Sequence, residues 1–100
     1  MTQELNERLA KKAGWIPGQD YGPAPNYVNS IDAQMRDLDP LVEKQYGRAV
    51  ERFHPNPDGR WSCEMAMWPM VTPIFRGHGP TRAAARAAAI DQALKEEGND

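Results

Sequence analysis

An alanine-rich segment near the end of the chain limits the available folds more than any other feature. Residues 82–95 read as one helix, with alanines repeated through its length and Thr81 placed to cap its start. Its expected apolar face consists of Ala83, Ala87, Ile90 and Leu94. Because alanine side chains are short, we expect this helix to lie close on a sheet and to end before Gly98.

Three strands are expected before this helix. Residues 48–53 form a short first strand, and residues 54–60 are rich in turn-forming Pro, Asn, Asp and Gly. Residues 61–67 alternate between apolar and polar, which is typical of a half-buried strand. The apolar positions of this alternation are Trp61, Cys63, Met65 and Met67. Prolines within residues 69–76 predict an edge or irregular strand, and Gly77-His78-Gly79-Pro80 predicts a turn.

Two helical regions are expected earlier in the chain. Residues 2–13 form a first helix that Gly14 stops, with Trp15 and Ile16 packing where it ends. Its apolar stripe is Leu5, Leu9 and Ala13. A proline- and glycine-rich loop over residues 17–28 follows.

The second helical region starts at Asn29 or Ser30, and its apolar stripe is Ile31, Met35 and Leu38. Pro40 interrupts it, because the residue before a proline resists helical geometry. Asp39 is then expected to cap a further turn that Gly47 ends.

The order of elements predicts an α+β fold, with helices covering one face of a small antiparallel three-stranded sheet in α-α-β-β-β-α order. The length of 100 residues fits a single domain. We divide it into an N-terminal helix (1–16), a loop (17–28), a helix-sheet-helix core (29–95) and an acidic tail (96–100).

Several classes of protein are disfavoured by composition. The chain has no apolar run of the ~20 residues that a membrane span needs, and its first residues lack the apolar core of a secretory signal, so we expect a cytosolic protein. Cys63 is the single cysteine, and with His54 and His78 it shows no zinc-ligand spacing. Neither histidine has a Ser or Cys partner at a recognisable spacing, so we expect no enzyme, no metal and no cofactor.

Acidic and aromatic residues in the first half are the preferred partner-binding candidates. They are Asp20, Tyr21, Tyr27, Asp32, Asp37 and Asp39. A proline-stiffened aromatic loop loses little entropy on binding, which suits recognition. The alternative is that both tyrosines pin the loop to the core. Trp68 also has two interpretations, as an exposed anchor or as cover for a second layer.

The segment from Gly77-His78-Gly79 through Thr81 to the alanine-rich helix resembles the end of double-stranded RNA-binding domains. In that family basic residues at a helix start contact phosphates. Arg82 and Arg86 fall where two of the family's basic residues lie, and with Arg76 and His78 they form an alternative nucleic-acid-binding set. Ala83 stands where the family has a further basic residue, and the net charge of the chain is −2.

A second resemblance covers nearly the whole chain. A helix ending in Gly14-Trp15, a proline-rich loop, a helix, Gly59-Arg60-Trp61 and a closing helix from Thr81 through Ala85 look like small phage proteins of the phage α-β-α sandwich family. This resemblance implies a phage origin and no known catalytic residues. Proteins of this size and source include anti-CRISPR inhibitors.

These resemblances lead to a specific expectation. The protein is expected to be a phage-encoded inhibitor of host defence that binds CRISPR effector subunits of a type I surveillance complex in the host cytosol and blocks target DNA. The rival is a nucleic-acid-binding module, and a third interpretation is a self-associating virion or prophage protein.

Overall fold

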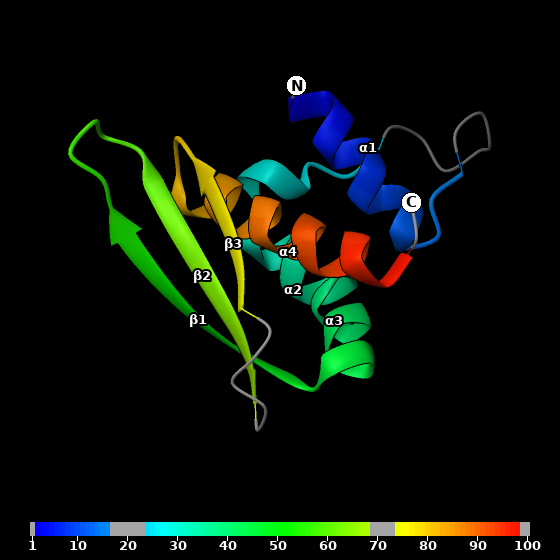
Figure 1. The fold of residues 1–100 in the computed structure, drawn as a ribbon. Helices are drawn as coiled ribbons and strands as arrows, with labels where there is room; N and C mark the ends of the chain where they lie inside the picture. The colour runs from blue at the N-terminus through cyan, green and yellow to red at the C-terminus, as the bar shows by residue number, and fades with distance from the viewer. Residues whose placement is uncertain (1, 17–23, 69–73, 99–100) are drawn as a thin grey trace.

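A computed structural model describes residues 2–16, 24–68 and 74–98 of the chain. Its described part holds four α-helices, a short 3-10 helix and a three-stranded antiparallel sheet (Figure 1), which confirms the predicted α+β class. In chain order the elements are α1 (Thr2–Lys12), η1 (Tyr27–Asn29), α2 (Ile31–Asp37), α3 (Asp39–Tyr46), β1 (Arg48–Pro55), β2 (Trp61–Trp68), β3 (Ile74–Gly79) and α4 (Arg82–Gly98).

The strands lie in the order β1-β2-β3, so that β2 is central. β1 continues two residues further than predicted, because His54 pairs with Ser62 and Pro55 pairs with Trp61. The turn between the strands is correspondingly tighter. Asn56 N donates to Arg60 O at 2.8 Å, and Gly59 supplies a φ of 86° that other residues rarely adopt.

The predicted turn at residues 77–80 is wrong, because β3 extends through Gly79. Gly77 and Gly79 are buried on the helix side of β3. A Cβ on Gly77 would lie 2.3 Å from both Ala85 O and Ala89 N. These glycines therefore serve close packing of a helix on a strand, not chain reversal.

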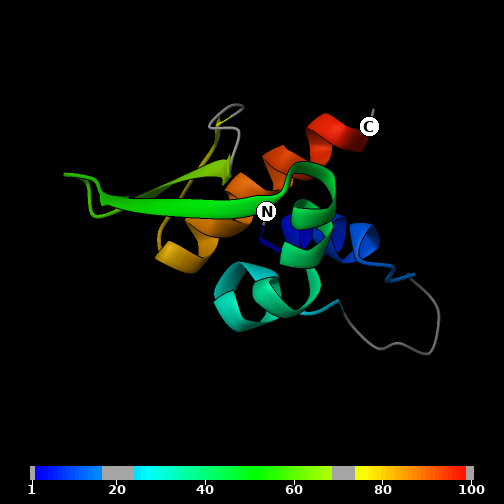
Figure 2. The same cartoon turned by 90° about the horizontal axis from the view of Figure 1, so that it is seen from below.

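α4 is the central helix of the molecule, packed against β2 and β3 on one side and against η1, α1, α2 and α3 around the rest (Figures 1 and 2). Thr81 caps it as predicted, since its hydroxyl accepts from Ala84 N at 3.1 Å. The helix extends to Gly98, past its predicted end, and it is buried well beyond the predicted stripe, of which Ala83 is only partly buried. Its buried residues are Ala84, Ala85, Arg86, Ala87, Ala89, Ile90, Ala93 and Leu94.

α1 ends one residue earlier than predicted, and Gly14 follows with a φ of 102°. Leu9 of its expected stripe is buried, but Ala13 is exposed because it lies beyond the last helical turn. Trp15 packs partly against the core as expected, whereas Ile16 is exposed.

α2 begins as predicted, because the Ser30 hydroxyl accepts from Ala33 N at 3.1 Å. Its buried face differs from the prediction: Met35 is 55 % exposed and Gln34 is fully buried. Gln34 is accommodated because its amide donates to the backbone carbonyls of Tyr27 at 2.6 Å and Ala83 at 2.9 Å. These hydrogen bonds satisfy the buried amide of Gln34, which α2 turns toward α4 in place of Met35.

α3 starts with Asp39 inside the helix, not as its cap, because Leu38 occupies the capping position. This frees the Asp39 carboxylate for another partner, described below. Gly47 ends the helix as expected, with a φ of 98°.

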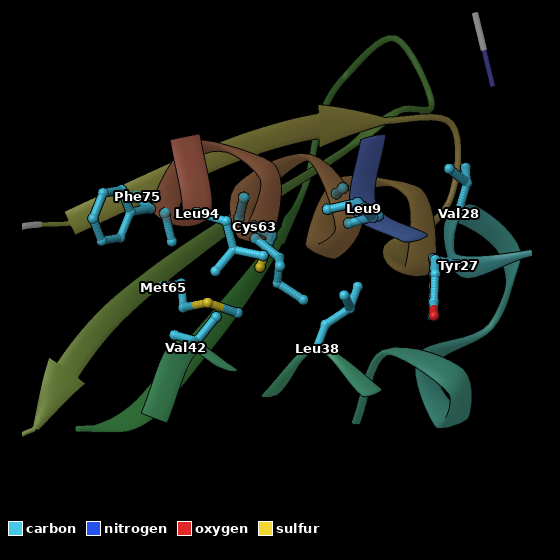
Figure 3. Packing of buried hydrophobic residues seen from close by; sticks show 14 of the residues in the cluster. Leu9, Tyr27, Val28, Leu38, Val42, Cys63, Met65, Phe75 and Leu94 are labelled. Atoms are coloured by element: carbon cyan, nitrogen blue, oxygen red, sulfur yellow. The ribbon is translucent and has the colours of Figure 1, made fainter. Parts of the chain in front are cut away.

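The core lies between the sheet and the helical layer. Figure 3 shows Met65 of β2 and Val42 of α3 beside Leu94 of α4, and Leu38 beneath the same helix. No helix in the described ranges is both long and apolar enough to cross a membrane.

Candidate partner-binding surfaces

The predicted acidic and aromatic set divides between the interior and the surface. Asp20 and Tyr21 lie outside the described residues. Tyr27 is only 2 % exposed, and its hydroxyl donates to Asp37 Oδ2 at 2.9 Å. Burial, reinforced by this hydrogen bond, raises the pKa of Tyr27 to about 12. In this fold Tyr27 pins its segment to the core, which was the alternative interpretation of the loop tyrosines.

Asp37 is occupied by partners within the chain. Arg36 donates to both of its carboxylate oxygens at 2.7 Å, and this pairing lowers the pKa of Asp37. Asp32, in the first turn of α2, is exposed. Among the described members of the set, Asp32 is therefore the one whose carboxylate is free for an external cation.

The remaining acid, Asp39, meets a residue of the rival nucleic-acid set. Asp39 Oδ2 accepts from Arg86 Nη2 at 2.7 Å. Arg86 is 2 % exposed and also donates to Glu51 at 2.6 Å and to Gln34 at 3.0 Å. We call Arg86, Asp39, Glu51 and Gln34 the Arg86 cluster; it joins α2, α3, β1 and α4.

The Arg86 cluster satisfies a buried cation. Burial alone would lower the pKa of Arg86, but hydrogen bonds to Asp39 and Glu51 outweigh burial and raise the pKa above its ordinary value. A charge held in this way stabilises one arrangement of the four elements and is not presented to phosphate. Helical spacing carried a signal for this role, since Arg86 lies four residues before Ile90 on the buried side of α4.

The rest of the nucleic-acid set is exposed but spread out. Arg76 and His78 lie on the side of β3 that faces away from the helices. Arg82, at the start of α4, stacks over the ring of Trp61 with 4.5 Å from Cζ to the ring centroid. This cation–π contact orients the guanidinium on the aromatic face.

The side of the sheet that faces away from the helices is a second candidate surface, which no residue set from the sequence described as a unit. We call it the outer face (Figure 2). Its residues with described side chains are Arg48, Val50, Arg52, His54, Ser62, Glu64, Ala66, Ile74, Arg76 and His78. Strand register arranges all of them except Arg48 in three complete cross-strand rows, so the signal that could have found this face was the alternation within all three strands taken together.

The first row is apolar: Val50 and Ile74 flank Ala66. Val50 is 55 % exposed and Ile74 is 42 % exposed. A shallow hollow opens beside them, lined by Val50, Glu51, Arg52, Glu64, Ala66 and Ile74. Exposed aliphatic side chains next to one another, with charged residues at their rim, offer apolar surface that a partner can cover.

The second row is charged, with Glu64 between Arg52 and Arg76. Glu64 accepts from Arg76 Nε at 3.0 Å and lies 3.4 Å from His54 Nε2. These contacts, the Arg76 hydrogen bond foremost, lower the pKa of Glu64. Arg52, opposite Glu64, makes no hydrogen bond or ion pair with a described residue.

The third row brings a serine and a histidine together that the sequence did not pair. Ser62 Oγ lies 2.8 Å from His78 Nδ1 and also accepts from Asn56 Nδ2 at 3.0 Å. A nucleophilic serine needs its histidine oriented by a third group, which would contact the other ring nitrogen. Within the described ranges Nε2 of His78 makes no hydrogen bond, so the pair lacks this third group and forms a polar cross-strand row.

Comparison of the chain with protein-family models, with curated proteins and with solved structures gave no match. In the parts of the chain that the structure describes, no three His, Cys, Asp or Glu side chains gather as metal ligands would. Function is therefore inferred from the surfaces themselves.

Proposed function

We propose that the protein works as a non-enzymatic inhibitor that binds a host macromolecular complex through the outer face of its sheet. The observation that carries this proposal is the pair of exposed aliphatic side chains, Val50 and Ile74, joined by Ala66 across the strands. When a partner covers exposed aliphatic side chains, the free energy of the complex falls by about 25 cal/mol per Å² of apolar surface buried. The flanking arginines add directional hydrogen bonds.

The kind of complex follows from the phage resemblance of the sequence and not from the geometry. On that basis the protein is a phage-encoded anti-CRISPR protein that binds subunits of a type I surveillance complex and blocks target DNA. Asp32 lies on α2, in the helical layer, and is not part of the outer face.

The proposal is tested with purified type I surveillance complexes, by interferometry for binding and by electrophoretic mobility shift for target DNA. We expect the protein to bind and to reduce DNA engagement, and Val50→Asp with Ile74→Asp to abolish both effects. Met35→Asp is the matched control, because Met35 is as exposed as Val50 but lies on α2. Binding that survives the double substitution, or no binding to any such complex, contradicts the proposal.

A nucleic-acid-binding module is the second candidate, because Arg76, His78 and Arg82 are all exposed. Each phosphate contact releases a counterion, so affinity would fall steeply with salt. Arg86 is buried, so this candidate now depends on Arg82 and Arg76. Fluorescence anisotropy with double-stranded RNA should lose its signal in the Arg76→Ala, Arg82→Ala variant; an unchanged signal removes this candidate.

A further inference from the structure

We infer that Arg52 and the apolar row together form a docking site for a protein segment that presents an aliphatic side chain beside a carboxylate. This inference rests on the proposed function, since it specifies the chemistry of the surface that the outer face would bind. Its partner is defined by charge and shape alone.

Charge complementarity is the first argument. The one carboxylate of the charged row, on Glu64, is already engaged by Arg76 through Oε2 and by His54 through Oε1. Arg52 lies directly across from Glu64 in register and has no acidic contact among the described residues. A planar guanidinium without a partner can hold an external carboxylate through two parallel hydrogen bonds.

The shape of the surface is the second argument. Val50 and Arg52 of β1 line one side of the shallow hollow, and Ile74 of β3 lines the opposite side. A side chain such as valine or leucine entering this hollow would cover both exposed aliphatic residues. Its neighbour on the same partner would then lie within reach of Arg52.

Two other occupants fit less well. Nucleic acid would bring phosphate groups against the charged row, and the carboxylate of Glu64 at the centre of that row repels phosphate. A second copy would place a row of two arginines and one glutamate, with a net charge of +1, against an identical row. The two rows would repel each other because their net charges have the same sign.

The experiment titrates the ¹⁵N-labelled full chain with a ten-residue peptide of alternating valine and aspartate, followed by amide chemical shifts. A peptide of alternating valine and lysine is the matched probe. We expect the acidic peptide to shift the amides of Val50, Arg52, Ala66 and Ile74 saturably, and the lysine peptide to leave them unchanged. Equal binding of both peptides, or shifts that map to α2 and α3, overturns the inference.

Three variants sharpen this test. Arg52→Glu should weaken the acidic peptide at least roughly fivefold, because a close unit charge is worth about that factor even in water. Arg60→Glu makes the same charge change in the β1–β2 turn and should have little effect. Glu64→Gln should strengthen binding, because it releases Arg76; equal effects of Arg52→Glu and Arg60→Glu would reduce the result to net charge and overturn the inference.

The other occupants give distinct outcomes. Larger shifts of the same amides with a fifteen-residue oligothymidylate overturn the inference in favour of nucleic acid, and concentration-dependent shifts without any probe overturn it in favour of a second copy. Peptide binding without binding to a type I complex retains the inference while contradicting the anti-CRISPR proposal, so the two can fail separately.

Discussion

The inner and outer faces of the sheet are made by the same three strands, but they place arginine in opposite surroundings. Against the inner face, Arg86 of α4 is 2 % exposed, and each of the three nitrogens of its guanidinium donates to a different residue. Outside, Arg76 shares a carboxylate with His54, and Arg52 has no described partner. The comparison separates charge that specifies the fold from charge that remains available to a partner.

The two faces also differ in how closely their side chains must fit a neighbouring element. Along β3, Phe75, Gly77 and Gly79 face α4, while Ile74, Arg76 and His78 face outward. The inner positions must match the surface of a helix, whereas no described helix packs over the outer ones. Substitutions at neighbouring residues should therefore differ widely in their effects.

Gly77→Ala should have the largest effect. Its new Cβ would lie 2.3 Å from backbone atoms of Ala85 and Ala89, which cannot move aside as a side chain can. We expect a loss of about 3 kcal/mol or more in the free energy of unfolding, measured by urea denaturation. Gly59→Ala is the control, because its Cβ would meet nothing within 4 Å and only its φ of 86° opposes the change, at roughly 1–2 kcal/mol. Similar losses at the two sites would refute the close packing of α4 on β3.

Arg86→Met should follow, with a loss of about 3 kcal/mol, because it leaves Asp39, Glu51 and Gln34 without their shared donor. Adding Asp39→Leu to this variant removes one of the carboxylates that lost its partner, so it should recover part of the lost free energy of unfolding. Arg76→Met, the outer-face counterpart, should leave the urea midpoint unchanged within error. If the two arginines proved equally dispensable, the contrast between the faces would fail.

Cys63 and Glu64 test the faces at adjacent residues. Burial first, and then the charge of Glu51, raises the pKa of the Cys63 thiol to about 11. The thiolate fraction at pH 8 should fall roughly a hundredfold, so disulfide exchange with an aromatic disulfide reagent should be at least that much slower than in urea. Because the folded-state pKa is raised, burying Cys63 as the neutral thiol stabilises the fold fully below pH 9, and this stabilisation is lost as pH rises from 9 to 11. Reaction at the rate of the unfolded chain would place Cys63 at the surface.

Glu64→Gln should have the smallest effect on stability. The pKa of Glu64 is lowered in the folded state, chiefly by the hydrogen bond to Arg76. The stabilisation that ionised Glu64 contributes is therefore present above its ordinary pKa of 4.5, and it is lost as pH falls through the lower folded-state pKa. Since the group is solvated, we expect wild type and variant to unfold at indistinguishable urea concentrations at pH 7 and at pH 3. A large difference at pH 7 would give the charged row a structural role.

Much of the fold could be predicted because it depends on local signals. The caps at Ser30 and Thr81, the stops at Gly14 and Gly47, and the alternation of β2 all depend on residues close in sequence. Predictions failed where a distant partner decides. The turn expected at Gly77–Pro80 gave way to a strand because glycine also allows a helix to approach, and spacing alone cannot separate the two uses.

The candidate site was harder to predict for the same reason. Asp39 and Arg86 were assigned to rival partner-binding sets, but in the structure they bind each other at 2.7 Å. They are 47 residues apart, so no local pattern joins them. The outer face likewise exists only once register places Val50, Ala66 and Ile74 in one row.

By itself, the sequence determined the kinds of elements, their order and the need for a close contact between an alanine-rich helix and a sheet, because capping, alternation and side-chain size act locally. Only the tertiary structure decided which charges are neutralised inside and which remain exposed, since a carboxylate binds whichever cation the packing of distant elements brings within about 3 Å. For this protein, that difference distinguishes Arg86, which holds the fold together, from Arg52, which we expect to hold a partner.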